Sequence, residues 1–136
     1  MQNLLKRLWQ DEQGQDLVEY ALLLVLIAPR HDEGAQALRD WADFVHIRYI
    51  AEAGVPGFGM ITPYENANTA DVPRFMHFYE METNDPEAAF QSMVSHVIAR
   101  LGGGPGTAVF DDWAGHPELR IVYVNTFRRV GERTRA

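Results

Sequence analysis

The chain has 136 residues, a length that suits a single domain. Its 12 lysine and arginine residues stand against 19 aspartate and glutamate residues, so the net charge is −7. Such a surface repels a phosphate backbone, and we expect no binding to nucleic acid. The sequence contains no cysteine, which excludes disulfides, thiolate catalysis and zinc sites built from thiolates.

The first segment joins a short amphipathic stretch to a strongly apolar run. The apolar side chains of the stretch are Leu4, Leu5, Leu8 and Trp9. The apolar run, residues 21–28, ends abruptly at Pro29 and Arg30. Eight apolar residues are too few to separate a strand from a buried helix by their period, so both alternatives stay open at this point.

The segment that follows, residues 34–53, is predicted to be a helix. Its apolar residues recur at steps of three and four: Leu38, Trp41, Ala42, Val45 and Tyr49. The turn residues Gly54-Val55-Pro56-Gly57 end the helix. Residues 58–65 then favour a strand that bends or reaches a sheet edge at Pro63.

Residues 74–81 form the clearest predicted strand. Large side chains on both faces indicate that both faces are covered, with Phe75, His77, Tyr79 and Met81 on one face and Met76 and Phe78 on the other. Asn84-Asp85-Pro86-Glu87 is typical of a helix start, and Gly102 of a helix end. Residues 107–113 fit a short helical turn, and residues 121–127 a last strand.

If residues 22–27 are the first strand, the element order is βαββαβ. This order predicts an α+β fold, the ferredoxin-like plait, in which a four-stranded antiparallel sheet carries its helices on one face. The other face would expose aromatic side chains, so we predict a homodimer through that open face. The expected boundaries are an N-terminal extension over residues 1–20, the domain over residues 21–130 and a tail over residues 131–136.

From Leu22 to about residue 130 the chain resembles the dimeric α+β barrel superfamily, which includes the EthD-like and stress-responsive barrel groups. The segments that carry the resemblance are Leu24–Pro29, Trp41–Ile47, Val55–Phe58 and Arg74–Glu80. Members of the superfamily include monooxygenases, decarboxylases, ring-cyclising proteins and haem-handling proteins. The resemblance therefore implies a fold and a homodimer rather than one reaction.

A second, shorter resemblance covers residues 4–28. The run from Gly14 to Tyr20 is similar to the processing site of Flp-type (type IVb) pilins, which are cut after a glycine and carry Glu and Tyr at the fifth and sixth mature positions. The resemblance implies cleavage between Gly14 and Gln15, with Glu19 and Tyr20 at those positions. It also implies export to the inner membrane or to an extracellular pilus.

The pilin alternative conflicts with the length of the apolar segment. A membrane-spanning helix needs about 20 apolar residues, whereas Leu17–Ala28 has 12 and contains Glu19. Burying the charged residues that follow Pro29 in lipid would be costly. We therefore favour a strand at residues 22–27 and a cytoplasmic protein that meets a membrane only if the pilin alternative holds.

Two histidines are the candidate catalytic residues. His46 lies at the margin of the apolar stripe of its helix, where Asp43, one turn earlier, could orient the imidazole or raise its basicity. His77 and Tyr79 share one face of a strand and could line a ligand pocket, with Tyr79 as donor and His77 as base. The alternatives are a surface histidine for His46, and packing in the core or dimer interface for His77 and Tyr79.

No cofactor or metal is indicated by the remaining motifs. The groups His31–Glu33 and Asp111, Asp112 and His116 lack a known ligand spacing, and the glycine run 102–106 lacks the ending of a phosphate-binding loop. The expected function is binding of a small apolar or aromatic molecule between helices and sheet. Whether the molecule is also transformed stays open, as do two further alternatives: an exported pilin-like subunit and a non-catalytic dimerisation module.

Overall fold

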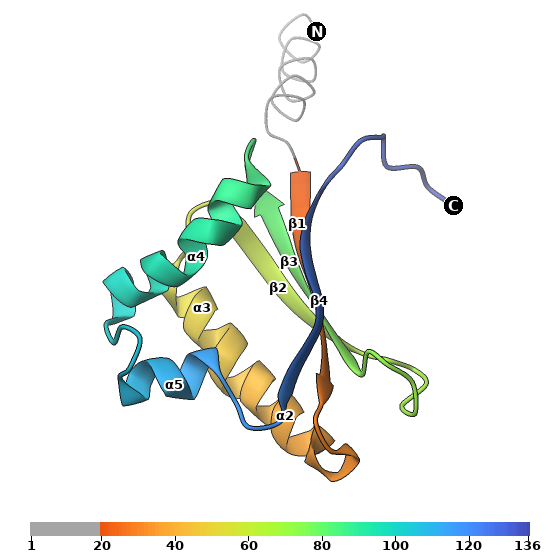
Figure 1. The fold of residues 1–136 in the computed structure, drawn as a ribbon. Helices are drawn as coiled ribbons and strands as arrows, with labels where there is room; N and C mark the ends of the chain where they lie inside the picture. Colours follow the sequence, from red (N-terminus) through yellow and green to blue (C-terminus); the bar gives the residue numbers. More distant parts are fainter. Residues whose placement is uncertain (1–19) are drawn as a thin grey trace, which may run out of the picture.

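Four strands form one antiparallel sheet in the order β2-β3-β1-β4 (Figure 1). The computed structural model describes residues 20–136. Its strands are β1 (Tyr20–Pro29), β2 (Phe58–Glu65), β3 (Phe75–Glu82) and β4 (Leu119–Arg128). The strand order and the interleaved helices are those of a ferredoxin-like plait, so the predicted α+β class is confirmed.

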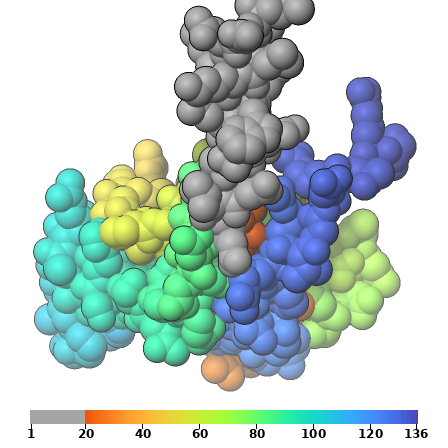
Figure 2. All heavy atoms as spheres, turned by 90° about the horizontal axis from the view of Figure 1, so that it is seen from above, coloured from red at the N-terminus to blue at the C-terminus, as the bar shows by residue number. Residues whose placement is uncertain are grey.

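The helices lie against one face of this sheet (Figure 1). Between β1 and β2 the chain forms one helical stretch made of η1 (Asp32–Gly34), α2 (Ala35–Trp41), η2 (Ala42–His46) and α3 (Ile47–Ala53). Between β3 and β4 it forms α4 (Pro86–Leu101) and α5 (Ala108–Ala114). Seen from above, α4 and α5 lie on one side of the molecule and β4 on the other (Figure 2). Within residues 20–136, no helix combines the length and the apolar character that a membrane crossing requires.

The segment η2 is a π-helical turn inside an otherwise α-helical stretch. The sequence predicts a helix here but not the π turn. Such turns insert an extra residue into the helical repeat and occur frequently at functional sites. His46 is the last residue of this turn, so its side chain projects from the π-helical part of the helix.

The apolar run that resembles a pilin helix is a strand. β1 pairs with β3 from Tyr20↔Glu82 to Ile27↔Phe75, and with β4 along its other edge. The helical, pilin-like alternative is therefore wrong for β1, because both edges of the segment satisfy their backbone groups in the sheet. Gly14, Gln15 and Glu19 lie outside the described residues, and Tyr20 opens β1.

The core lies between the sheet and the helices, and β3 shows how it is built. Along β3 the side chains that face the helices, Phe75, His77, Tyr79 and Met81, are all buried. Met76 and Phe78 lie on the opposite face, as predicted. Among residues 20–136, His77 is the only buried residue of a polar type, and the buried Tyr79 adds a hydroxyl group on the same face of β3.

The face of the sheet away from the helices is open and carries many apolar side chains, together with Thr62, Asn125 and Glu80. Directly paired residues of neighbouring strands share a face, and two rows cross the sheet on this side: Tyr64, Met76, Leu26 and Tyr123, then Thr62, Phe78, Leu24 and Asn125. Tyr64 is 50% exposed and Tyr123 is 42% exposed. We call this surface the open sheet face.

Replacing Leu23 by alanine should test the position of β1. Leu23 is fully buried against the helices, so we expect Leu23→Ala to lower the free energy of unfolding by about 3 kcal/mol. Leu22→Ala, on the open sheet face, is the matched control and should cost less than half as much. Urea unfolding at a concentration too low for subunit association measures both. Equal losses would contradict the assignment of the two leucines to opposite faces.

Candidate functional site

His46 lies beneath α5 and bonds to its backbone. The Nδ1 atom of His46 is 2.6 Å from the carbonyl oxygen of Trp113. Because a carbonyl oxygen only accepts hydrogen bonds, Nδ1 must carry the proton and donate it. In the neutral ring the other nitrogen, Nε2, is then left with its lone pair, so this contact fixes the tautomer of His46.

The ring of His46 is held between two tryptophans. The centroid of Trp41 is 4.9 Å away at an interplanar angle of 28°, and that of Trp113 is 6.0 Å away at 21°. The stack continues to Tyr49 beyond Trp113 and to His116 beyond Trp41, with centroid distances of 5.8 and 5.5 Å. His46 is therefore not the exposed surface histidine that one alternative proposed.

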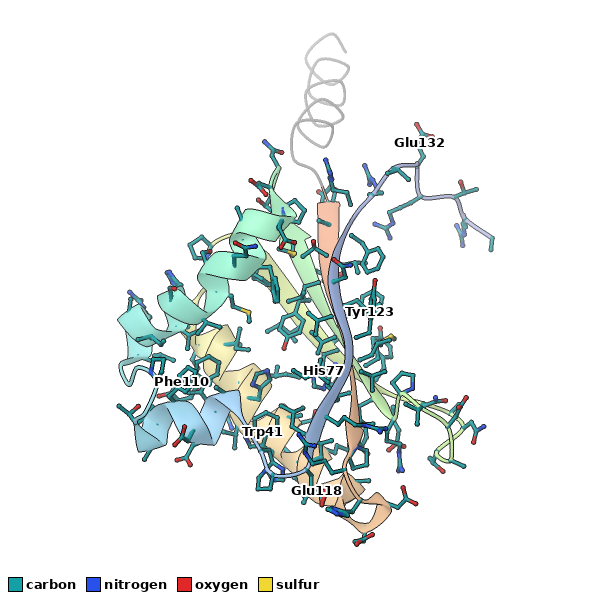
Figure 3. The ribbon with its side chains drawn as sticks, viewed as in Figure 1. Trp41, His77, Phe110, Glu118, Tyr123 and Glu132 are labelled. Carbon is teal, nitrogen blue, oxygen red and sulfur yellow. The ribbon has the colours of Figure 1, made fainter. Side chains whose placement is uncertain are left out.

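His77 approaches the same region from the sheet. It lies on the helix-facing side of β3 and is 2% exposed, and Figure 3 shows it between the sheet and the helices. The structure gives neither of its ring nitrogens a hydrogen-bond partner among residues 20–136. Neither nitrogen is among the fully enclosed side-chain atoms left without a partner, and His77 lines a small cleft from which water can reach it.

Both imidazoles are uncharged at neutral pH. Burial lowers the pKa of His77 to about 4, with a smaller contribution from the nearby His46. Burial also lowers the pKa of His46, and the hydrogen bond to Trp113 opposes this only in part. Each ring can therefore accept a proton from a neutral ligand, and neither attracts an anion by its own charge.

A small cleft leads from the surface to His77. Its volume is about 40 Å³, and its lining residues are Arg39, Asp43, Pro63, Tyr64, Glu65, Phe75 and His77. A single water needs about 10–15 Å³ of such space. The cleft therefore admits a few waters or a small polar group and is too small for an aromatic ring. The cleft lies where α2 and η2 meet the β2 edge of the sheet.

The charges at the mouth of the cleft compensate one another. Nε of Arg39 lies 3.6 Å from Oδ2 of Asp43, and Nη1 of Arg39 lies 4.0 Å from Oε2 of Glu65. The same oxygen of Glu65 lies 3.4 Å from Nη2 of Arg74. Asp43 was predicted to orient His46, but its ion pair is with Arg39, while the oriented nitrogen of His46 bonds to Trp113. Asp43 is brought to the cleft of His77 instead.

Tyr79 belongs to the core beside His77. It is 1% exposed and meets the edge of Phe58 at a centroid distance of 6.1 Å. Burial raises the pKa of Tyr79 above its ordinary value, so its hydroxyl keeps its proton and can act only as a neutral group. His77 and Tyr79 face the helices, so neither lies on the open sheet face through which the dimer is predicted to form.

The other polar groups considered from sequence have local structural contacts. His31 bonds to Glu118 through Nδ1 at 3.0 Å, which ties the end of β1 to the start of β4. The Nδ1 atom of His116 accepts a hydrogen bond from the backbone N–H of Glu118. The carbonyl of Asp112 accepts the indole N–H of Trp41 at 2.6 Å. Within residues 20–136, no three acidic or histidine side chains gather in a way that could hold a metal.

Two parts of the site were not recognised in the sequence. Trp41 was assigned to packing alone, and nothing indicated that the carbonyl of Trp113 would meet His46. The two hydrogen bonds from α2 and η2 to α5 join residues 71 and 67 positions apart. The sequence predicted only a short helical turn over residues 107–113, and that prediction does not specify a partner.

Comparison with known proteins supports the fold. No protein-family profile matches the chain, and no curated protein is similar to it in sequence. Among solved structures it is similar to a dimeric ferredoxin-like protein from an uncultured marine organism, with a TM-score of 0.57 and 13% identity over 85% of this chain and 99% of that chain.

Two further solved structures share the fold. A candidate monooxygenase from Shewanella loihica PV-4 is 14% identical, and HapK from Hahella chejuensis is 13% identical, each with a TM-score of 0.53. Both matches cover 85% of this chain and 98% of the other. None of these likenesses supports the pilin-like segment, and membership of the EthD-like group stays a prediction.

The pKa of His77 predicts a pH dependence of stability. The unfolded chain takes up this proton near pH 6.5, but the folded protein resists it until about pH 4. Stability should therefore fall as the pH falls through this window, by about 3 kcal/mol from His77 alone. His77→Phe removes this contribution and keeps that of His46. Urea unfolding at pH 7 and pH 4 measures the difference, and identical pH slopes for the two proteins would contradict it.

Proposed function

We propose that the protein binds a small, uncharged aromatic or apolar molecule between helices and sheet and transfers a proton through His46. The observation that carries the proposal is the hydrogen bond from His46 Nδ1 to the Trp113 carbonyl. It leaves Nε2 as a lone-pair nitrogen within an aromatic surrounding, which is the state that a general base requires. The lowered pKa of His46 keeps that nitrogen free at neutral pH.

His77 would orient the polar end of the ligand. Its ring nitrogens lack partners, and it lies at the inner end of the cleft that Asp43 and Arg39 border. A neutral hydroxyl or carbonyl group could pair with it without bringing a charge into the core. Tyr79, next to it on β3, would form the wall of the site as a protonated phenol.

The protein is also proposed to be a homodimer through the open sheet face. Tyr64 and Tyr123 border an apolar row that continues through Met76 and Leu26. Aromatic residues of this kind are enriched where protein interfaces bury their centres. The marine protein of the same fold is described as dimeric, which favours the same arrangement here.

A non-catalytic dimerisation module is the second candidate. The small volume of the cleft, about 40 Å³, favours it, because no space in this form of the site holds an aromatic ring. This candidate assigns the histidines and tryptophans to packing alone. It accounts for Trp41 and Tyr49, but it gives no role to the cleft that reaches the buried His77.

A panel of uncharged phenols, aromatic aldehydes and ketones should separate the two candidates. We expect at least one class to raise the melting temperature of the protein, and His77→Phe to abolish that rise. Where a compound is turned over, His46→Gln should lower kcat by about 100-fold or more, since general acid–base catalysis contributes at least that much. Full turnover by His46→Gln would remove His46 from the catalytic role. No melting response to any class would favour the dimerisation module.

Tyr123→Glu should weaken the proposed dimer. A charge in the buried centre of an interface lacks a partner, and loss of an interface aromatic commonly weakens association by about 2 kcal/mol, or roughly 30-fold. Phe44→Glu is the matched control, because Phe44 is 66% exposed but lies on η2, away from the open sheet face. Sedimentation equilibrium measures both. Equal dissociation constants for the two variants, or a monomeric wild type, would contradict the proposal.

A further inference from the structure

α5 is a seven-residue helix bounded by glycines on both sides. The run before it, residues 102–106, contains Gly102, Gly103 and Gly106 at φ values of 82°, 78° and 91°, and Gly115 follows it. A left-handed backbone conformation is readily adopted by glycine and by few other residues. The two flanking segments therefore have the backbone freedom that a moving element needs.

Side chains from the helix below hold α5 in place at its carboxyl end. Trp41 donates its indole N–H to the carbonyl of Asp112, and His46 donates Nδ1–H to the carbonyl of Trp113, both at 2.6 Å. The ring of Trp113 itself is buried, and its Nε1 has no partner among residues 20–136. The closed position thus combines two hydrogen bonds and the burial of the Trp113 ring in the core with one unsatisfied buried donor, which costs part of what they contribute.

In this position Trp113 of α5 covers one face of the His46 ring. His46 lies between Trp41 and Trp113, and the cleft on the opposite side is too small for an aromatic ring. The side chain of His46 is partly exposed, but both faces of its ring are covered by tryptophans, so a ligand of the proposed class gains room beside the ring when a neighbouring element moves. Of the elements that contact His46, α2 and α3 continue the same helix, whereas α5 is joined to the rest through glycines.

We propose that α5 is a lid. Its opening admits the ligand, and its closing fixes the tautomer of His46 that leaves Nε2 as the base. Opening about residues 102–106 and Gly115 withdraws Trp113 from the ring of His46. Closing returns the Trp113 carbonyl to Nδ1, which fixes the tautomer with its lone pair on Nε2. Trp113 is then a positioning residue that acts through its backbone. The inference rests on the proposed binding site and adds the route to it.

Stiffening the two glycine segments should slow the lid. Gly104 and Gly115 do not have positive φ values, and a methyl group at either would meet its nearest atom at 3.9 Å, so alanine fits both positions. The double variant Gly104→Ala/Gly115→Ala should show several-fold slower hydrogen exchange of the α5 amides. Gly131→Ala, with open space around it in the tail, is the matched control and should exchange like the wild type.

Access to His46 can be followed with diethyl pyrocarbonate, which acylates an unprotonated imidazole nitrogen. We expect its reaction with His46, read by mass spectrometry, to slow several-fold in the double variant. Its reaction with His31, whose side chain is 67% exposed, should not change. The chain lacks cysteine, so thiol side reactions do not consume the reagent.

A second variant should move the same measurements in the opposite direction. Trp41→Phe keeps an aromatic ring beside His46 but removes the donor to Asp112. Loss of one hydrogen bond of ordinary strength should raise both α5 exchange and His46 acylation about fivefold.

The lid is overturned if the α5 amides exchange only by global unfolding, or if His46 reacts equally fast in wild type, double variant and Trp41→Phe. These measurements use no turnover, so they separate two failures. A mobile α5 without ligand binding would contradict the proposed function and leave the lid intact. A bound aromatic compound with a static α5 would contradict the lid and leave the proposed function intact.

Discussion

The structure depends on the pairing of β1 with both β3 and β4 in the centre of the sheet. That pairing places Leu23 and Ile27 under the helices and sets which side chains of β3 share their face. Because side chains alternate along a strand, a slip of one residue would turn His77 to the opposite face and bring Phe78 into the core. The position of His77 therefore depends on the register of β1, although β1 contributes no polar side chain to the candidate site.

Local patterns were enough to predict the sheet, its class and the two faces of β3, because period and turn residues are properties of neighbouring positions. The π turn and the position of α5 could not be predicted in this way. His46 and Trp113 are 67 positions apart, and their hydrogen bond exists only once the chain has folded back over η2. The sequence named His46, His77 and Tyr79 as candidates. It did not reveal that Asp43 pairs with Arg39 or that a backbone carbonyl orients His46.

His31 and His77 lie in opposite environments. His31 lies at the surface, and its contact with Glu118 raises its pKa, so that histidine is stabilised in its charged form. His77 is buried without a partner, and its pKa is lowered. A histidine kept for structure would be expected to gain a partner or to be replaced by an apolar residue of similar size. His77 instead lines a small cleft, and a polar side chain in an otherwise apolar core is typical of functional positions.

The two faces of the sheet can serve different purposes because alternation along each strand separates them. On β3, His77 and Tyr79 face the helices, while Met76 and Phe78 face outward from the next positions. Association through the open sheet face would bury apolar rows without touching the lid, since α5 packs on the opposite layer (Figure 1). It would also hold β1 and β3 rigid from behind. Motion would then be confined to the helical side, where α5 is joined by glycines and held by two hydrogen bonds and the buried ring of Trp113. If the sheet is stiffened on one face and α5 moves on the other, His77 stays fixed beneath a site that opens.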